Sequence, residues 1–234
     1  MESVNTFCLN QHSLYLRSII NHKSIKMKKL FFLPLALYSF LMLGQNVVVV
    51  EYRHVESEHI AEFEAKEIDY WSKVKQNGID EGYMLASAFF RLIDAGRVDD
   101  ETMPTHAFVH VYKDFEQLVN SSKMWSNTEK ILGMKQSLVS TDDISTTMRI
   151  QRYKLIDEIL PLREFKYAVW NYAKPKDLNG FVNENLKLWK PYFQKKVGKN
   201  GLAGYGILAR VHPQGMEQSS VLTYDHYTDL ASAM

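Results

Sequence analysis

Two stretches of this chain share one spacing of aromatic, glycine and arginine residues. In each, a Phe is followed eight residues later by a Trp, and a Gly and an Arg nine residues apart come after them. The matching residues are Phe63, Trp71, Gly82 and Arg91 in the first stretch and Phe181, Trp189, Gly201 and Arg210 in the second. The offset is 118 residues at the Phe and the Trp and 119 at the Gly and the Arg. Since 234 residues can hold two small domains, the repeat predicts two similar units in tandem.

The composition is that of a folded globular protein. Apolar residues make up 46% of the chain and charged residues 24%, values that exclude wholesale disorder. The formal net charge of +1 gives no reason to expect a polyanion, so no nucleic acid is predicted as a partner.

Residues 27–44 have the parts of a secretory signal peptide. Met27 is followed by two lysines, an apolar run from Leu30 to Leu43, and Gly44 before a polar residue. The run is too short to span a bilayer comfortably as a helix. A buried core helix or an uncleaved membrane anchor remains the alternative. We therefore expect an exported bacterial protein, periplasmic or extracellular, that meets the membrane only during export.

Residues 1–26 would then be a non-native extension upstream of a start at Met27. The single cysteine, Cys8, lies in this extension. The processed chain would therefore have no disulfide, no thiolate nucleophile and no Cys-ligated metal.

The first unit is expected over residues 45–120. The run VVVVEY from Val47 predicts a buried strand, and Ser57 is a suitable N-cap for an amphipathic helix that ends at Asn77-Gly78. A strand is expected over 82–93, where a helix is also compatible with the composition, and an alternating strand over 106–112 precedes a helix that begins at Asp114. The order β, α, β, β, α is that of a ferredoxin-like unit with helices on one face of an antiparallel sheet, which makes the fold class α+β.

A linker over 121–164 and a second unit over 165–234 are expected to follow. The linker is predicted to be helical over 144–160, and Pro161 ends the pattern. The second unit shows a strand over 165–172, a helix after Asp177, a glycine-rich loop over 198–206, and strands over 207–211 and 220–224. Its last helix would begin near Asp229 and is short, so this unit either lacks the helix or is truncated.

This tandem pattern resembles the dimeric α/β-barrel superfamily, which includes monooxygenase-like domains, haem-degrading enzymes and dye-decolourising peroxidases. The resemblance covers residues 47–234 and rests on element order and on the repeated aromatic helix. It implies that two ferredoxin-like units place their sheets face to face in a pseudo-dimeric barrel. Because that scaffold serves many chemistries, it implies no activity, and no catalytic residue of the family is matched here.

The strand over 106–112 supplies the first candidate pocket wall. If Ala107, Val109 and Val111 face the helices, the alternate side chains point between the two sheets; these are His106, Phe108, His110 and Tyr112. The two imidazoles stand about 13 Å apart at ~3.3 Å per residue, so no metal site is predicted. Either could ligate a haem or act as an acid or base, or both could be hydrogen-bonded sheet residues.

Four further residues complete the predicted ligand-binding set. Trp170 and Tyr172 alternate with Val169 and could stack on a ligand, or could pack as ordinary strand residues. Arg91 and Arg210 recur at matching places and could bind a carboxylate, or form surface ion pairs. Trp71 and Trp189 fall on the buried stripes of their helices, where core packing is expected.

Two functions remain open on the sequence alone. The first is an exported module that binds a small apolar or aromatic ligand within the barrel. The second is a cofactor-independent or haem-dependent oxidoreductase on the same scaffold, with His106 or His110 as ligand or base. The sequence identifies neither the ligand, the cofactor nor the oligomeric state.

Overall fold

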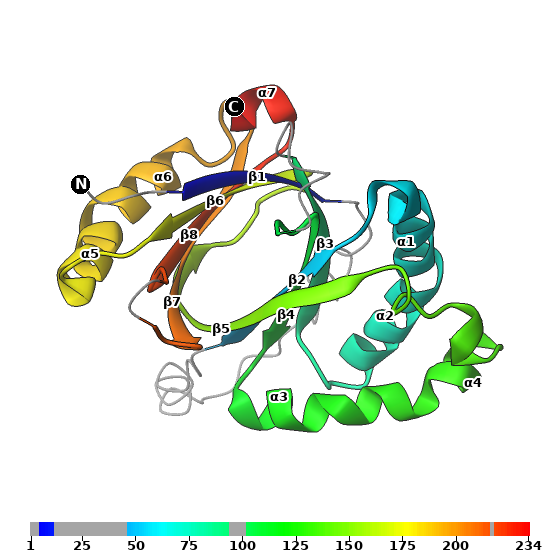
Figure 1. Cartoon of the computed structure of the whole chain (residues 1–234). Coiled ribbons are helices and arrows are strands. Elements are labelled where there is room, and N and C mark those ends of the chain that lie inside the picture. Colours follow the sequence, from blue (N-terminus) through cyan, green and yellow to red (C-terminus); the bar gives the residue numbers. More distant parts are fainter. Residues whose placement is uncertain (1–4, 12–45, 94–101, 216–217) are drawn as a thin grey trace, which may run out of the picture.

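A closed antiparallel barrel forms the centre of the molecule (Figure 1). The computed structural model describes residues 5–11, 46–93, 102–215 and 218–234. The order of strands around the barrel is β1-β3-β4-β2-β5-β7-β8-β6. Their bounds are β1 Asn5–Gln11, β2 Val47–His54, β3 Ala86–Ile93, β4 His106–Tyr112, β5 Thr146–Ile159, β6 Tyr167–Ala173, β7 Leu202–His212 and β8 Val221–Tyr227. The predicted α+β class is confirmed.

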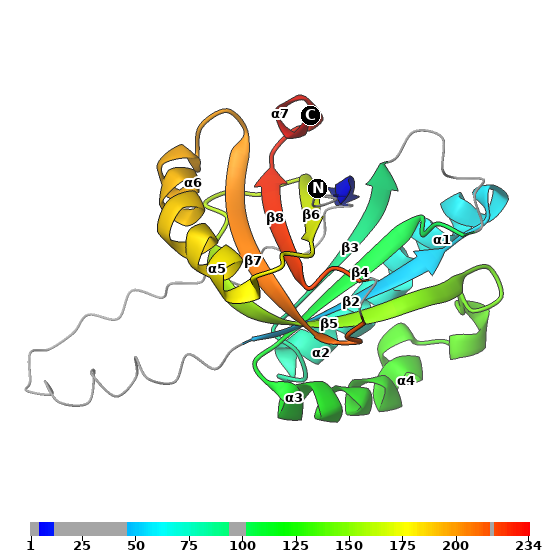
Figure 2. The same cartoon turned by 60° about the vertical axis from the view of Figure 1, so that its left-hand side comes forward.

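Helices cover the outside of the barrel on two sides. In Figures 1 and 2, α1 and α2 lie with α3 and α4 on one side, and α5 and α6 lie on the other. The bounds are α1 Ile60–Lys66, α2 Ser72–Asp80, α3 Phe115–Asn120, α4 Thr128–Leu132, α5 Leu178–Glu184, α6 Lys190–Lys196 and α7 Leu230–Ala233. We call residues 47–159 the first half, and residues 167–234 together with β1 the second half.

Each half carries a helix that is interrupted by a π-helical segment. The segments are Glu67–Trp71, between α1 and α2, and Asn185–Trp189, between α5 and α6. They lie 118 residues apart, the offset of the Phe and Trp repeat. Gly82 and Gly201 follow the two helices, and both have a positive φ (78° and 76°) that an L side chain rarely adopts. The repeated spacing therefore marks repeated backbone geometry.

The first helix ends later than predicted. It continues through Asn77 and Gly78 to Asp80, and the left-handed residue is Gly82. A Cβ on Gly78 would lie 2.7 Å from the methyl carbon of Met124, so this glycine allows close packing of two helical segments and does not end the helix.

The prediction of a helix over 144–160 is wrong, because this segment forms the long strand β5. It pairs with β2 on one side and β7 on the other, with irregularities in the register near Leu155. The side chains of β5 that face inward include Gln151 and Glu158, so the strand lacks a clean alternation of apolar and polar residues. The predicted glycine-rich loop is also partly wrong, because Gly204 and Gly206 lie within β7.

Strand β1 stands between β3 and β6, antiparallel to both (Figure 2). The second half thus has the order β7-β8-β6-β1, and the first half has β3-β4-β2-β5. Residues 27–44, the expected signal peptide, lie outside the described residues, so export and its cleavage site stay predictions. The expected non-native extension over residues 1–26 contains β1, so a start at Met27 or cleavage after Gly44 would remove a strand of the barrel. Within the described part of the chain, no helix is long and apolar enough to cross a membrane.

Candidate functional site: a cavity inside the barrel

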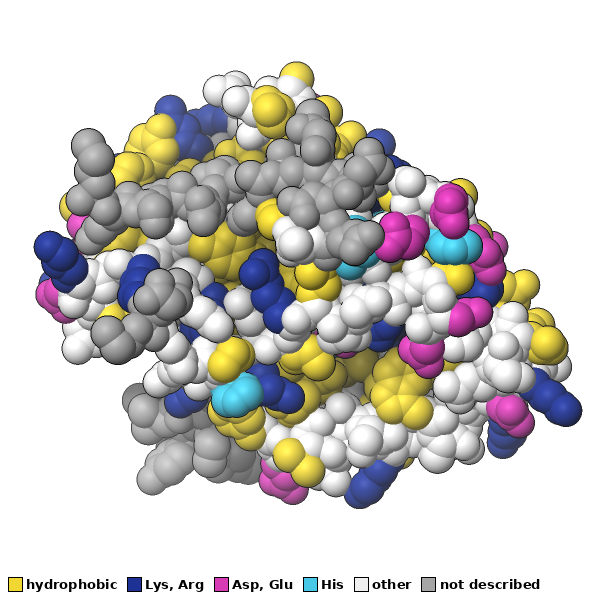
Figure 3. Space-filling model, viewed as in Figure 1, with side chains coloured by type: hydrophobic (Ala, Val, Ile, Leu, Met, Phe, Trp, Pro, Cys, Tyr) yellow, Lys and Arg dark blue, Asp and Glu magenta, His cyan; other side chains and the backbone are white. Residues whose placement is uncertain are grey.

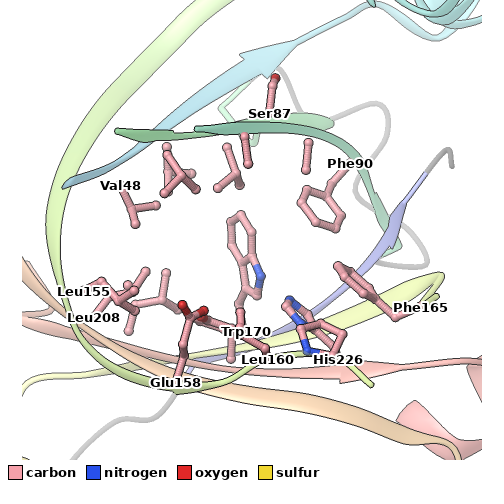
Figure 4. Close-up of a pocket in the computed structure, with 18 residues that line it drawn as sticks. Val48, Ser87, Phe90, Leu155, Glu158, Leu160, Phe165, Trp170, Leu208 and His226 are labelled. Carbon is pink, nitrogen blue, oxygen red and sulfur yellow. The ribbon is translucent and has the colours of Figure 1, made fainter. Parts of the chain in front are cut away.

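The barrel holds an apolar cavity of about 190 Å³ that is partly open to solvent (Figure 4). The first half contributes most of the aliphatic wall together with Phe90 and Glu158, and the second half contributes Trp170, Tyr224 and His226. The lining residues include Val48, Val50, Ala88, Phe90, Val109, Val111, Leu155, Glu158, Phe165, Trp170, Leu208, Leu222, Tyr224 and His226.

Trp170 stands in the middle of the cavity in Figure 4. Its ring meets that of Phe90 edge to face, with centroids 5.6 Å apart, and that of Tyr52 likewise at 6.3 Å. Such contacts hold the indole in one orientation on the cavity wall. The structure places Trp170, which the sequence offered as a stacking residue, on the cavity wall; ligand stacking stays a prediction.

A carboxyl and a phenol meet on the otherwise apolar wall. The hydroxyl of Tyr224 donates a hydrogen bond to Oε2 of Glu158 at 3.2 Å. Burial raises the pKa of the Glu158 carboxyl, and burial also raises the pKa of Tyr224. The pair can hold a proton or take one from a molecule in the cavity, as a tuned acid or base requires.

His226 lies next to this pair. Its ring stacks on Phe165 at 3.8 Å, and the ring of Tyr224 is 4.9 Å away. Burial lowers the pKa of His226 to about 3, so the imidazole is neutral. Among the described residues its Nδ1 has no hydrogen-bond partner.

Two glycines of β7 make room for these rings. Gly206 pairs with Tyr224 and Gly204 with His226. A Cβ on Gly204 would lie 3.3 Å from Nδ1 of His226, and one on Gly206 would collide with the Tyr224 ring. The glycine-rich sequence therefore allows aromatic side chains to lie flat against a strand.

The predicted orientation of the 106–112 strand is wrong. The strand alternates as expected, but Ala107, Val109 and Val111 face the barrel interior. The other four side chains, His106, Phe108, His110 and Tyr112, lie beneath the helices. The interior face of this strand carries small residues because Trp170 and the cavity occupy the barrel interior. The large rings lie on the opposite face, between the sheet and the helices.

Both histidines of this strand have structural contacts outside the cavity. His106 is fully buried, with Nε2 3.1 Å from Glu64 Oε1 and Nδ1 2.9 Å from Thr105 Oγ1. Nδ1 of His110 is 3.1 Å from Ser87 Oγ, and burial together with nearby Lys75 lowers the pKa of His110 to about 3. Neither imidazole can reach a haem placed in the cavity, so the expected haem ligands do not fit that role. Among the described residues, no cluster of metal-ligating side chains occurs.

The two predicted arginines do not occupy equivalent places. Arg91 is on the helix side of β3, 3.4 Å from Glu64. Arg210 faces the barrel interior and hydrogen-bonds Gln218 and Ser219. Tyr172 also faces inward, where its hydroxyl bonds that of Tyr52.

A second pocket, more polar, lies between the first-half helix and the sheet. Phe108 and His110 line it together with the buried ion pair Glu67–Lys75, whose Oε2 and Nζ are 2.8 Å apart. Over the face seen in Figure 3, positive and negative side chains are interspersed.

Sequence reasoning missed Glu158, Tyr224 and His226. They come from two strands that only the barrel brings together. The alternation of Leu222, Tyr224 and His226, opposite glycines two residues apart in β7, was the available signal.

Comparisons with known protein families and with curated proteins find no match. Among solved structures, the chain is similar to an anthrone oxidase-like protein (12% identity, TM-score 0.47, covering 82% of this chain and 77% of that one). It is also similar to a monooxygenase candidate from Lactobacillus acidophilus NCFM (8%, 0.49, 81% and 80%) and to a chlorite dismutase candidate (9%, 0.45, 80% and 81%). Likenesses at this level carry no functional argument. The fold is therefore described from the chain's own strand order, a closed antiparallel barrel, without a specific family.

Proposed function

We propose that the two halves are tandem copies of one ferredoxin-like unit, facing each other across a shared interior. The matched π-helical segments and the matched positive-φ glycines support this. So do Asp114 and Asp229, which cap α3 and α7 in the same way, each accepting a hydrogen bond from the backbone N–H three residues later. In this arrangement β1 takes the place that β5 holds in the first half.

We propose that the protein is a cofactor-independent oxidoreductase that acts on a small, mainly apolar molecule held in the barrel. The observation that carries this proposal is the Glu158–Tyr224 pair. A cavity that only binds apolar ligands gains nothing from a desolvated carboxyl, because burying it costs free energy. A carboxyl whose pKa is raised by its surroundings is suited to proton transfer near neutral pH.

The chemistry follows from the lining. Glu158 removes a proton from a weakly acidic C–H of the substrate, and the apolar walls exclude water. The carbanion gives its electrons to dioxygen, a proton returns from Glu158, and the resulting hydroperoxide loses water. The balance is CH₂ plus O₂ giving C=O plus H₂O, so neither a metal nor an external reductant is consumed.

Oxygen uptake with anthrone tests this proposal, because anthrone is an apolar tricycle with an acidic CH₂ group. We expect the full-length protein to accelerate uptake and Glu158→Gln to slow it by about 100-fold or more, the range for loss of a general base. Glu116→Gln is the control, since this carboxylate is exposed on α3 and does not line the cavity. Binding of anthrone without uptake by the wild type would instead support the non-catalytic binding module.

A further inference from the structure

A polar layer lies beyond the apolar cavity, one inward position further along its strands. Four strands, β2, β5, β6 and β7, each contribute one side chain to this layer. Each of these side chains points inward and stands two positions along its strand from a residue that lines the cavity. Val50 is followed by Tyr52, Trp170 by Tyr172 and Leu208 by Arg210, and Leu155 is preceded by Tyr153. We call Tyr52, Tyr153, Tyr172 and Arg210 the tyrosine–arginine layer.

The members of this layer contact one another. Nη2 of Arg210 donates to the hydroxyl of Tyr153 at 3.4 Å, and its guanidinium carbon lies 5.6 Å from the centroid of that ring. The hydroxyls of Tyr52 and Tyr172 bond each other. Arg149, near the surface, places its guanidinium carbon 4.3 Å from the centroid of the Tyr52 ring.

Within residues 46–93, 102–215 and 218–234, the positive charge of Arg210 has no carboxylate partner. The residue is only 7% exposed, and its hydrogen-bond acceptors among the described residues are neutral oxygens. Its Nε is buried and has no partner in the described part of the chain. Arg149 likewise forms no ion pair there.

The tyrosines do not supply the missing negative charge. Burial raises the pKa of Tyr52, Tyr153 and Tyr172, so all three are neutral at physiological pH. A buried cation without a counter-ion is costly. The buried cation of the first half, Lys75, does have a counter-ion, because it pairs with Glu67.

We propose that the tyrosine–arginine layer binds the carboxylate of an organic acid whose apolar body lies in the barrel cavity. This inference rests on the proposed function and names its substrate class. Arg210 is four residues from Gly206, the partner of Tyr224, which is about 13 Å along β7. A fused-ring acid fits that span, with its carboxylate at Arg210 and its rings between Leu208, Leu222 and Trp170.

The test compares 2-naphthoate with 2-naphthamide, which has nearly the same shape and no charge. Isothermal titration of each compound into the full-length protein measures its affinity. The ratio of the two affinities is the preference for the acid. We expect the wild type to bind 2-naphthoate at least tenfold more tightly. Arg210→Gln should reduce the preference to less than twofold and leave the affinity for 2-naphthamide unchanged.

Two further variants control for charge and fold. Arg152→Gln removes a positive charge of β5 that lies outside the barrel near His212, and should keep the preference. Arg210→Lys keeps the charge without the planar fork and should give an intermediate preference. If Arg210→Gln does not fold, the carboxylate site is still tested by the preference for 2-naphthoate over 2-naphthamide in the wild type and in Arg210→Lys.

Equal affinity of the wild type for the two probes would overturn the carboxylate site, and so would a preference that survives in Arg210→Gln. Binding of neither probe would count against the cavity as a binding site and therefore against the proposed function itself. Binding of both without oxygen uptake from anthrone would leave the carboxylate site intact and contradict only the catalytic role of Glu158.

Discussion

The two halves of the barrel share a π-helical segment and a positive-φ glycine at matching places, but different side chains surround them. Trp71 and Trp189 end the two π-helical segments at matching positions. Trp71 is 8% exposed, donates to the carbonyl oxygen of Val139 and packs edge to face on Trp125. Trp189 is 46% exposed and donates to Glu184 instead. The expected burial is thus confirmed for Trp71 and wrong for Trp189.

The difference in exposure between Trp71 and Trp189 shows that the repeated aromatic residues mark a repeated backbone geometry and do not indicate burial. In the first half, the segment that carries α3 and α4 covers the helix, whereas no described residue plays that part over Trp189. The interior divides in a similar way. The first half provides most of the aliphatic wall together with Phe90 and Glu158, and the second half provides Trp170, Tyr224 and His226.

The largest expected difference between the halves concerns Glu67 and Asn185, which begin the two π-helical segments. Glu67→Ala leaves the buried ammonium of Lys75 unpaired and should lower the free energy of unfolding by about 3–5 kcal/mol. Asn185→Ala removes an acceptor for Tyr205 and should cost about 1–3 kcal/mol. Urea denaturation at pH 7 measures both.

The matched double variant sharpens this comparison. Glu67→Asn with Lys75→Phe copies the second half, where Phe193 stacks on Tyr205 at 4.4 Å. We expect the double variant to recover most of the stability lost in Glu67→Ala. Equal losses in Glu67→Ala and Asn185→Ala would show that the buried charge does not distinguish the halves.

The second prediction concerns pH, because His110 and Asp225 hold the same place in β4 and β8 but titrate in opposite senses. The pKa of His110 is lowered to about 3, so the unfolded chain gains its proton first, and stability falls as pH drops below about 6.5. Burial raises the pKa of Asp225 to about 7, so stability present at pH 4 is lost as pH rises toward 7.

Thermal unfolding between pH 4 and 8 checks both directions. His110→Asn should reduce the acid-side loss, and Asp225→Asn should reduce the loss between pH 4 and 7, each by a few kcal/mol at most. Profiles that keep the wild-type slope in both variants would show that other groups control the pH dependence.

The smallest expected effect comes from the two tryptophans themselves. Trp71→Phe removes the hydrogen bond to Val139 and should cost about 1–3 kcal/mol. Trp189→Phe should change stability by less than about 0.5 kcal/mol, as exposed substitutions usually do. Similar losses at both sites in urea denaturation would argue that Trp189 is covered in solution.

Most strands and helices could be predicted from local patterns, but the site could not. The alternation in β4 was correct, yet both faces of that strand are buried, so hydrophobicity could not decide which face the helices cover. Strand β5 was mistaken for a helix because its interior positions include polar residues that serve the cavity and the tyrosine–arginine layer. Glu158 and Tyr224 are 66 residues apart, and only barrel closure brings them together.

A cavity-filling variant tests most directly whether the barrel interior is the binding site. Ala88 lines the cavity on the first-half wall. Ala88→Trp should weaken 2-naphthamide binding at least tenfold in isothermal titration, and Val119→Trp on the exposed surface of α3 should leave it unchanged. Wild-type affinity in a folded Ala88→Trp protein would contradict a ligand site inside the barrel.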